Sequence, residues 1–195
     1  MILGLLGDIH GNHLALEAVL ESAKIRQVEK LLITGDVVGY YYKPKEVLNL
    51  LKEWDIELVR GNHEDMLERA ISDSSYLTEI GKKYGSGLRV AIEEFDIKTL
   101  KFFRNLKQKI VIKWPNLDIM LCHGSPWQTS QYVYPDVNED VLNKYLEFEA
   151  DVFVQGHTHY PLFKKIKEKL IINPGSVGQP RNGAKGANWA QSRPL

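Results

Sequence analysis

Five short apolar runs in this chain each lead directly into a turn that contains glycine and at least one histidine, aspartate or asparagine. With their turns, the runs are ILGLLGDIH, KLLITGD, IELVRGNH, LDIMLCHG and DVFVQGHTH. Runs of this length, bounded by turn signals, are typical of buried β-strands. Amphipathic helices separate the first three, and strands that alternate with helices pair in parallel. Because ligands of open α/β sheets bind beyond the carboxyl ends of the strands, the turns are predicted to converge on one site.

Apolar residues at helical spacing predict the helices that flank these strands. The stretch 66–106 is predicted to be mostly helical with an interruption at 84–87, and another helix is predicted at 138–150. Two β-hairpins are predicted, with turns at 115–116 and 167–168. A parallel first half and hairpins in the second half together predict an α/β fold with two layers of sheet and helices outside.

Length and composition limit the class of protein. A chain of 195 residues predicts one domain over 1–195, in which the polar, glycine-containing segment 183–195 reads as a disordered or truncated tail. Its 25 basic and 25 acidic residues balance, so net charge gives no argument for nucleic acid or an anionic membrane. The single cysteine, Cys122, excludes an internal disulfide and is expected to pack as an apolar residue. With no apolar run long enough to span a membrane, a cytoplasmic location is expected.

All six histidines lie in the turns that follow predicted strands. They are His10, His13, His63, His123, His157 and His159. The same turns carry the oxygen donors Asp8, Asp36 and Asn62. Imidazole, carboxylate and amide donors suit borderline and hard divalent cations. The donors are too many for one ion, so two metals bridged by one carboxylate are predicted.

The five blocks GDIH, GDVVG, GNHE, CHG and GHTH, in this order, resemble the signature of the calcineurin-like metallophosphoesterases. The resemblance spans 7–159, and NPGS at 173–176 looks like the family's closing element. It implies a four-layer α/β/β/α sandwich of two mixed sheets flanked by helices, with a dinuclear metal site at the carboxyl ends of the strands. Within the family, the chain looks more like the small prokaryotic phosphodiesterase-like members than like the protein phosphatases.

The resemblance implies a role for each matching residue. Asp8, His10 and His159 would bind one metal, Asn62, His123 and His157 the other, and Asp36 would bridge them. His63 would face the substrate phosphate as the catalytic histidine. The implied activity is hydrolysis of a phosphodiester or small phosphorylated metabolite by a hydroxide that bridges the metals. Manganese is expected first, with nickel, cobalt, iron, zinc and magnesium as alternatives.

The chain departs from the protein phosphatases of this family. These enzymes follow their second block with an acidic residue that pairs with the catalytic histidine and an arginine that binds phosphate. Gly39 and Tyr40 stand at those positions here. His63 therefore lacks an acidic partner, and the difference argues against a protein phosphatase.

Several residues near the blocks have two readings. Asn12 contacts substrate or, preferably, caps the first helix, and His13 contacts substrate or is an exposed first-turn residue. Acids at 64–65 are read as favourable charges at a helix start rather than catalytic groups.

The loops near the blocks hold aromatic and basic residues. The tyrosines at 40–42 either stack on a substrate group or cover the core, and the sequence favours neither interpretation. The same ambiguity holds for Trp127 and Tyr132, whereas Arg181 and Lys185 either meet phosphate or form a solvated loop, the second being favoured.

The alternative function is protein binding without catalysis. Some proteins of this fold, such as a retromer coat subunit, are non-catalytic protein-interaction modules that are expected to have eroded ligands. All seven expected ligands are present here, which favours the enzyme. Because no apolar strand is apparent after 173–176, an exposed sheet edge and a homo-oligomer are also expected.

Overall fold

Two sheets form the centre of the protein in this computed structural model, which describes residues 1–114 and 116–192. The first sheet consists of β1 (Leu3–Leu6), β2 (Lys30–Ile33), β3 (Asp55–Leu58) and β9 (Ala190–Ser192). Its order is β3-β2-β1-β9. The first three strands pair in parallel, as the alternation with helices predicts, and β9 runs antiparallel to β1.

The second sheet contains both predicted hairpins. It consists of β4 (Lys109–Trp114), β5 (Leu117–Cys122), β6 (Val152–Val154), β7 (Pro161–Ile166) and β8 (Lys169–Pro174), in the order β4-β5-β6-β8-β7. The pairs β4–β5 and β7–β8 are antiparallel, whereas β6 is parallel to both of its neighbours. Position 115 of the first predicted turn lies outside the described residues. At the second turn, Lys167 adopts φ 50°, the left-handed conformation of a tight hairpin.

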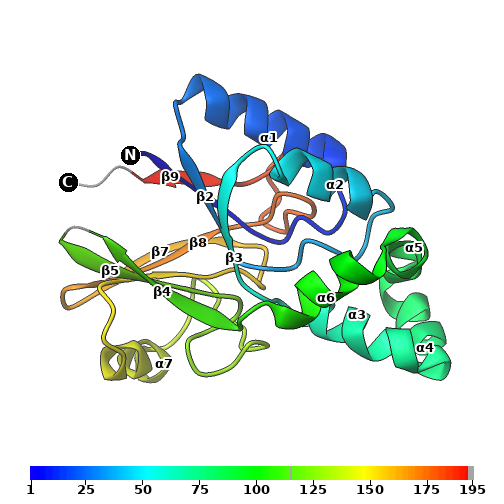
Figure 1. Ribbon diagram of the computed structural model, residues 1–195. Coiled ribbons are helices and arrows are strands. Elements are labelled where there is room, and N and C mark those ends of the chain that lie inside the picture. The colour runs from blue at the N-terminus through cyan, green and yellow to red at the C-terminus, as the bar shows by residue number, and fades with distance from the viewer. Residues whose placement is uncertain (115, 193–195) are drawn as a thin grey trace.

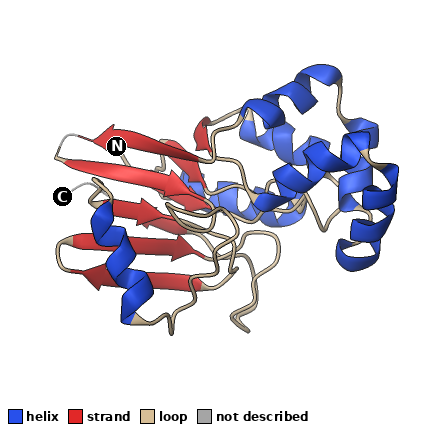
Figure 2. Ribbon diagram, turned by 90° about the horizontal axis from the view of Figure 1, so that it is seen from below, coloured by secondary structure: helices blue, strands red, loops and turns tan. Residues whose placement is uncertain are grey.

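Helices cover the outer faces of the two sheets (Figure 1). On the first sheet lie α1 (His13–Ile25) and α2 (Pro44–Leu51). Across the strands of the second lies α7 (Glu139–Asn143), which continues as a 3-10 turn at Lys144–Glu147 (Figure 2). The predicted helix at 138–150 is thus shorter and partly 3-10. The two sheets face each other through a buried cluster that includes Leu5, Leu32, Leu121 and Val154. The predicted α/β fold with two mixed sheets flanked by helices is confirmed.

Four further helices form a group beside the sheets (Figure 1). They are α3 (Asn62–Ser72), α4 (Ser74–Tyr84), α5 (Gly87–Glu94) and α6 (Ile97–Asn105). The interruption predicted at 84–87 is present, with Gly85 at φ 80°. Two more breaks occur at Asp73 and Asp96, whose carboxylates cap the next helices by accepting hydrogen bonds from Tyr76 N and Thr99 N. None of the helices in the described ranges has the length and apolar character needed to cross a membrane.

The C-terminal segment differs from its prediction. Rather than forming a loose tail throughout, the chain returns to the first sheet, where Ala190 pairs with Leu5 and Ser192 with Leu3. The expectation that no strand remains to cover this edge is therefore wrong. Because β9 covers the edge of β1, an exposed edge at β1 no longer supports a homo-oligomer. A strand of three residues with one apolar member is too short to show a period in the sequence. Its formation depends on pairing with β1 more than on its own residues.

Candidate metal centre

The turns that follow β1, β2, β3, β5 and β6 meet at one end of the two sheets, as predicted. They bring together side chains that are far apart in the sequence and almost fully enclosed. Asp8, His10, Asp36 and His123 have at most 1% of their surface exposed. His63, His157 and His159 are also buried. Such a concentration of buried carboxylates and imidazoles is unfavourable unless the groups are paired or bind a cation.

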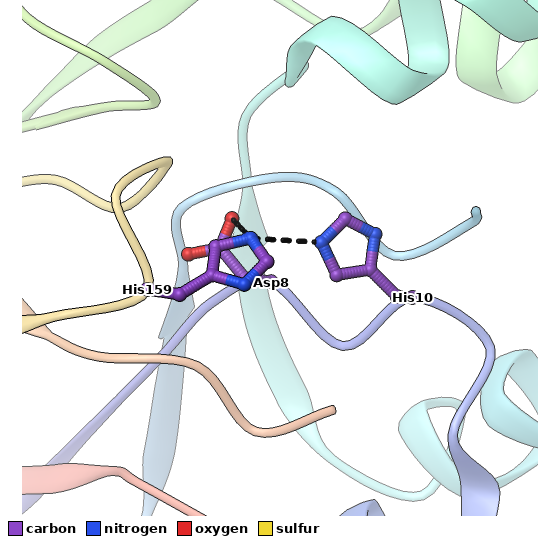
Figure 3. A group of neighbouring side chains, drawn as sticks. All are labelled: Asp8, His10 and His159. Atoms are coloured by element: carbon purple, nitrogen blue, oxygen red, sulfur yellow. Dashed lines mark hydrogen bonds and ion pairs between the residues drawn. The ribbon is translucent and has the colours of Figure 1, made fainter. Parts of the chain in front are cut away.

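Asp8, His10 and His159 form the first group of close donor atoms (Figure 3). The Nε2 atoms of His10 and His159 are 3.1 Å apart, and His159 Nε2 is 3.6 Å from Asp8 Oδ1. The Asp8 carboxylate is held by the backbone N–H of His157, which donates to both oxygens at 3.0 and 3.2 Å. Three donor atoms thus converge from two separate segments, the turn after β1 and the turn after β6.

Asp36, His123 and His157 form the second group. The Nε2 atom of His123 is 3.1 Å from Nδ1 of His157 and 3.4 Å from Oδ2 of Asp36. The amide oxygen of Asn62 lies 2.9 Å from the same His123 nitrogen. The four residues expected around one metal are therefore adjacent.

Asp36 lies between the two groups. Its Oδ2 is 3.8 Å from Nε2 of His10 in the first group and 3.4 Å from Nε2 of His123 in the second. Its other oxygen accepts a hydrogen bond from the backbone N–H of His63 at 2.8 Å. This is the position that a bridging carboxylate requires.

Backbone carbonyls orient three of the imidazoles. The Nδ1 atoms of His10, His123 and His159 lie 3.1, 2.7 and 2.7 Å from the carbonyl oxygens of Val38, Thr34 and Gln179. Since a carbonyl only accepts, each Nδ1 must carry the proton, and each Nε2 is turned toward the cluster. Such carbonyl partners fix the tautomer of metal-binding histidines.

Burial and neighbouring charges shift the protonation equilibria of the cluster. Burial lowers the pKa of His157 to about 3 and that of His159 to about 4, which keeps both imidazoles neutral, as a metal ligand must be. Burial raises the pKa of the Asp8 carboxyl to about 8. Burial opposes protonation of His123 as well, but the Asp36 carboxylate outweighs it and raises the His123 pKa to about 10. Without a cation, Asp8 and His123 would therefore both carry a proton at neutral pH, and binding of divalent cations would have to release these protons.

The backbone at the cluster is held in an uncommon conformation. Five of the proposed ligands are non-glycine residues with φ between 52° and 69°: Asp8, His10, Asp36, His157 and His159. Each such residue costs of order 1 kcal/mol relative to ordinary backbone. Left-handed conformations of this kind persist where surrounding contacts enforce them, and they gather at functional sites.

The sequence matches the family model described as the calcineurin-like phosphoesterase superfamily domain over residues 1–190. The chain belongs to the calcineurin-like phosphoesterase superfamily. A metallophosphoesterase structure from Sphaerobacter thermophilus superposes with a TM-score of 0.80 at 26% identity, covering 100% of this chain and 84% of that one. Serine/threonine-protein phosphatase 2 of Escherichia coli is 25% identical, over 90% of this chain and 88% of its own. Phosphodiesterase YfcE of the same species is 25% identical, over 79% and 82%.

Within this calcineurin-like fold, His63 stands beside both groups. Its ring lies 4.6 Å from that of His10, and one of its nitrogens forms a further close set with His10 and Asp36. Its Nδ1 is buried and has no hydrogen-bond partner among the described residues. A Cβ added at Gly39 would stand 2.5 Å from that nitrogen and 2.7 Å from His10 Nδ1. Any larger residue at position 39 would displace both rings, so the packing explains why no acidic partner occurs there.

Tyr40 and Arg181 meet beside the first donor group. The Tyr40 ring lies 4.6 Å from His10 and 5.1 Å from His63, and its hydroxyl accepts a hydrogen bond from Arg181 Nη2 at 3.1 Å. Arg181 is exposed and its backbone N–H donates to the carbonyl of His159. Arg181 and Lys185 are both exposed, as the preferred reading of a solvated loop expects. The hydrogen bond to Tyr40 shows in addition that this loop borders the cluster at Arg181.

Contacts in the structure locate other residues that have two readings. Asn12 caps α1, because its side-chain oxygen accepts a hydrogen bond from Ala15 N, and its amide nitrogen donates to Gly178 O. Since the backbone engages both polar atoms, the capping interpretation is preferred to a substrate contact. His13 is the first residue of α1 and is outside the three donor groups. Trp127 packs on Tyr145, a core residue. Tyr132, by contrast, lies 4.2 Å from the ring of His157.

Tyr84 is a site neighbour that the sequence did not indicate. It ends α4, and its ring is 5.1 Å from that of His63 and 5.7 Å from that of Tyr40. Its helix was recognisable, but nothing in the sequence shows that the C-terminus of this helix packs against the turn after β2.

Glu64 has a larger role than the predicted favourable charge at a helix start. Its buried carboxylate accepts hydrogen bonds from four backbone N–H groups, those of Asp36, Val37, Val38 and Gly61, at 2.8 to 3.3 Å. The turn after β2 and the start of α3 are thereby joined, which fixes Asp36 relative to Asn62. The GNHE block contained the signal, since a glutamate three residues after a helix cap often reaches back to the backbone.

Replacement of Glu64 by alanine is expected to destabilise the fold by at least about 3 kcal/mol, because each buried donor left without a partner costs about 1–3 kcal/mol. Urea unfolding measures the change. Asp65→Ala is the matched control: Asp65 pairs with Arg60 at a half-exposed position, and such a pair contributes about 0–1 kcal/mol. Equal effects of the two substitutions would contradict the role given to Glu64.

Proposed function

We propose that this chain is a dinuclear metal-dependent phosphoesterase that hydrolyses a phosphodiester or a small phosphorylated metabolite. The observation that carries the proposal is the convergence of seven donors into two groups with Asp36 between them. Asp8, His10 and His159 would hold one cation, and Asn62, His123 and His157 the other. The mixed imidazole and oxygen donors suit manganese and related divalent ions.

The residues of the chain have separate tasks in this proposal. Bound cations would supply Lewis-acid chemistry, lowering the pKa of water and neutralising charge on the phosphate. His63 lies beside both donor groups and burial lowers its pKa, so its imidazole is neutral at physiological pH. We assign it to the leaving oxygen, where the neutral ring stabilises charge by donating a hydrogen bond and the minor imidazolium form delivers a proton; a positioned acid contributes about 10²–10⁴-fold.

Arg181 is proposed to bind substrate phosphate. The arginine that protein phosphatases carry after their second block is replaced here by Tyr40. Arg181 enters from the opposite end of the chain and donates to the hydroxyl of that same tyrosine. A guanidinium at this place can donate to an anionic oxygen of the substrate while its position is set by Tyr40.

Arg181→Ala is expected to raise KM for a phosphodiester about tenfold with kcat reduced less than about threefold, because hydrogen bonds to charged groups contribute about 1.5–3 kcal/mol. Steady-state kinetics measure both constants. Lys185→Ala removes an exposed cation from the same loop and is expected to change neither. If the two variants behave alike, Arg181 contributes only general positive charge.

The alternative, a protein-interaction module without catalysis, predicts loss of ligand residues. All proposed donors are present and clustered, which supports the enzyme. Hydrolysis of bis(4-nitrophenyl) phosphate by manganese-loaded protein is the direct test. Turnover that is lost in the Asp36→Ala variant supports the proposal, and absence of turnover toward diesters and monoesters by protein shown to contain metal supports the alternative.

A further inference from the structure

Aromatic side chains flank the candidate metal centre at both donor groups. At the first group, Tyr40 and Tyr84 pack around His10 and His63. At the second group, Tyr132 lies against the ring of His157, with centroids 4.2 Å apart and planes tilted by 39°. Tyr134 is stacked on Tyr132 with an angle of only 9° between the planes and centroids 5.6 Å apart. That separation at a near-parallel angle requires an offset stack.

The pair Tyr132 and Tyr134 exposes aromatic surface on either side of a buried residue. Tyr132 is 49% exposed and Tyr134 is 38% exposed, whereas the intervening Val133 is completely buried. Residues i and i+2 thus share one side of this segment, and the residue between them points inward. Val133 joins the core cluster of Tyr145 and Phe153, so the two rings are anchored from behind. A pre-organised aromatic surface beside a ligand-binding centre is suited to stacking.

A phosphodiester has two ester substituents, and the proposed site has two aromatic flanks. His63 and its neighbour Tyr84 mark the side of the leaving group, since His63 is assigned to the leaving oxygen. The other substituent, retained on the phosphate after cleavage, then extends toward His157 and the Tyr132–Tyr134 pair. A flat aromatic group such as a nucleobase gains stacking there that an alkyl group does not.

We propose that Tyr132, supported by Tyr134, is a specificity-determining residue that selects phosphodiesters whose retained substituent is a nucleoside. This inference rests on the proposed phosphoesterase function and adds the class of substrate to it.

Two substrates with the same leaving group isolate the retained substituent. They are thymidine 5′-(4-nitrophenyl) phosphate and methyl 4-nitrophenyl phosphate, which both release nitrophenolate. Wild-type protein loaded with manganese is expected to prefer the thymidine ester in kcat/KM. Tyr132→Leu is expected to lower kcat/KM about tenfold for the thymidine ester, in line with the contribution of base–aromatic stacking, and to change the methyl ester less than twofold. Tyr132→Phe retains the ring and is expected to keep the preference.

Phe163→Leu is the matched control, because Phe163 is an aromatic residue of β7 that is 69% exposed and outside the donor groups. Calorimetric titration of thymidine 5′-monophosphate and methyl phosphate gives a second measurement that does not depend on turnover. Tyr132→Leu is expected to weaken the first about tenfold and the second less than twofold.

Equal losses on both esters would show that Tyr132 only supports His157, which overturns the inference. Hydrolysis of both esters by wild type without preference for thymidine overturns it as well but leaves the phosphoesterase function intact. Hydrolysis of neither ester by metal-loaded protein overturns the inference, and it overturns the phosphoesterase function as well when monoesters are not hydrolysed either.

Discussion

Removal of divalent metal by a chelator is expected to lower the melting temperature by about 5 to 10 °C and to abolish phosphodiester hydrolysis. A ligand present at a hundredfold excess over its dissociation constant stabilises the folded state by about 2.7 kcal/mol. For a chain of this length, each kcal/mol corresponds to roughly 2–4 °C. The physical reason lies in the cluster, where Asp8 and Asp36 are buried among left-handed backbone segments from three different turns. Bound cations would neutralise the carboxylates and tie these segments together.

Calorimetric scans before chelation, after it and after addition of manganese measure this effect alongside activity. The Asp8→Asn variant, which removes one proposed ligand charge, is the control, and the chelator is expected to shift its melting temperature less. Full activity and an unchanged melting temperature after exhaustive chelation are incompatible with a two-metal centre. Restoration of stability without activity would indicate that a metal binds but not in a catalytic arrangement.

The convergence of the proposed ligands could be predicted because each depends on local signals. Apolar runs identify β1, β2, β3, β5 and β6, and the parallel arrangement of the first three places their turns at one edge. The donor types in those turns then indicate a cation. Pairing of His10 with His159 across 149 positions follows from this convergence, although no distance could be given.

Features that depend on tertiary contacts were not predictable. The strand β9 is short and has no period of its own, so its pairing with β1 is visible only in the folded chain. Trp127 and Tyr132 occur in the same loop with similar surroundings in the sequence, yet one packs on Tyr145 and the other on His157. Likewise Arg181 reaches Tyr40 over 141 positions through the course of the segment after β8. Side-chain direction in loops depends on packing that no local pattern encodes.

Asp36→Ala is expected to lose at least one metal and to reduce turnover by at least about 10³-fold. Asp36 is the proposed shared carboxylate, so its removal leaves two nearby cations with less neutralising charge and takes a ligand from each. The substitution also removes the acceptor for the backbone N–H of His63, which is now paired at 2.8 Å. Metal analysis of purified protein, together with circular dichroism to confirm folding, separates loss of metal from loss of structure. Retention of two metals per chain with near-normal turnover would contradict the bridging role.

His63→Ala is expected to keep both metals and the fold while turnover falls by about 10²–10⁴-fold on substrates with poor leaving groups. Nitrophenolate needs little protonation as it departs, so hydrolysis of a nitrophenyl ester should fall much less than that of an alkyl ester. The reason is specific to this chain: Gly39 leaves the Nδ1 of His63 without an acidic partner, so the imidazole acts without the assistance that protein phosphatases provide. Rates on both ester types, measured with the metal content of each variant, distinguish the outcomes. Loss of metal comparable to that of Asp36→Ala would make His63 a ligand, whereas equal slowing of both esters would make it a group that orients phosphate rather than a proton donor.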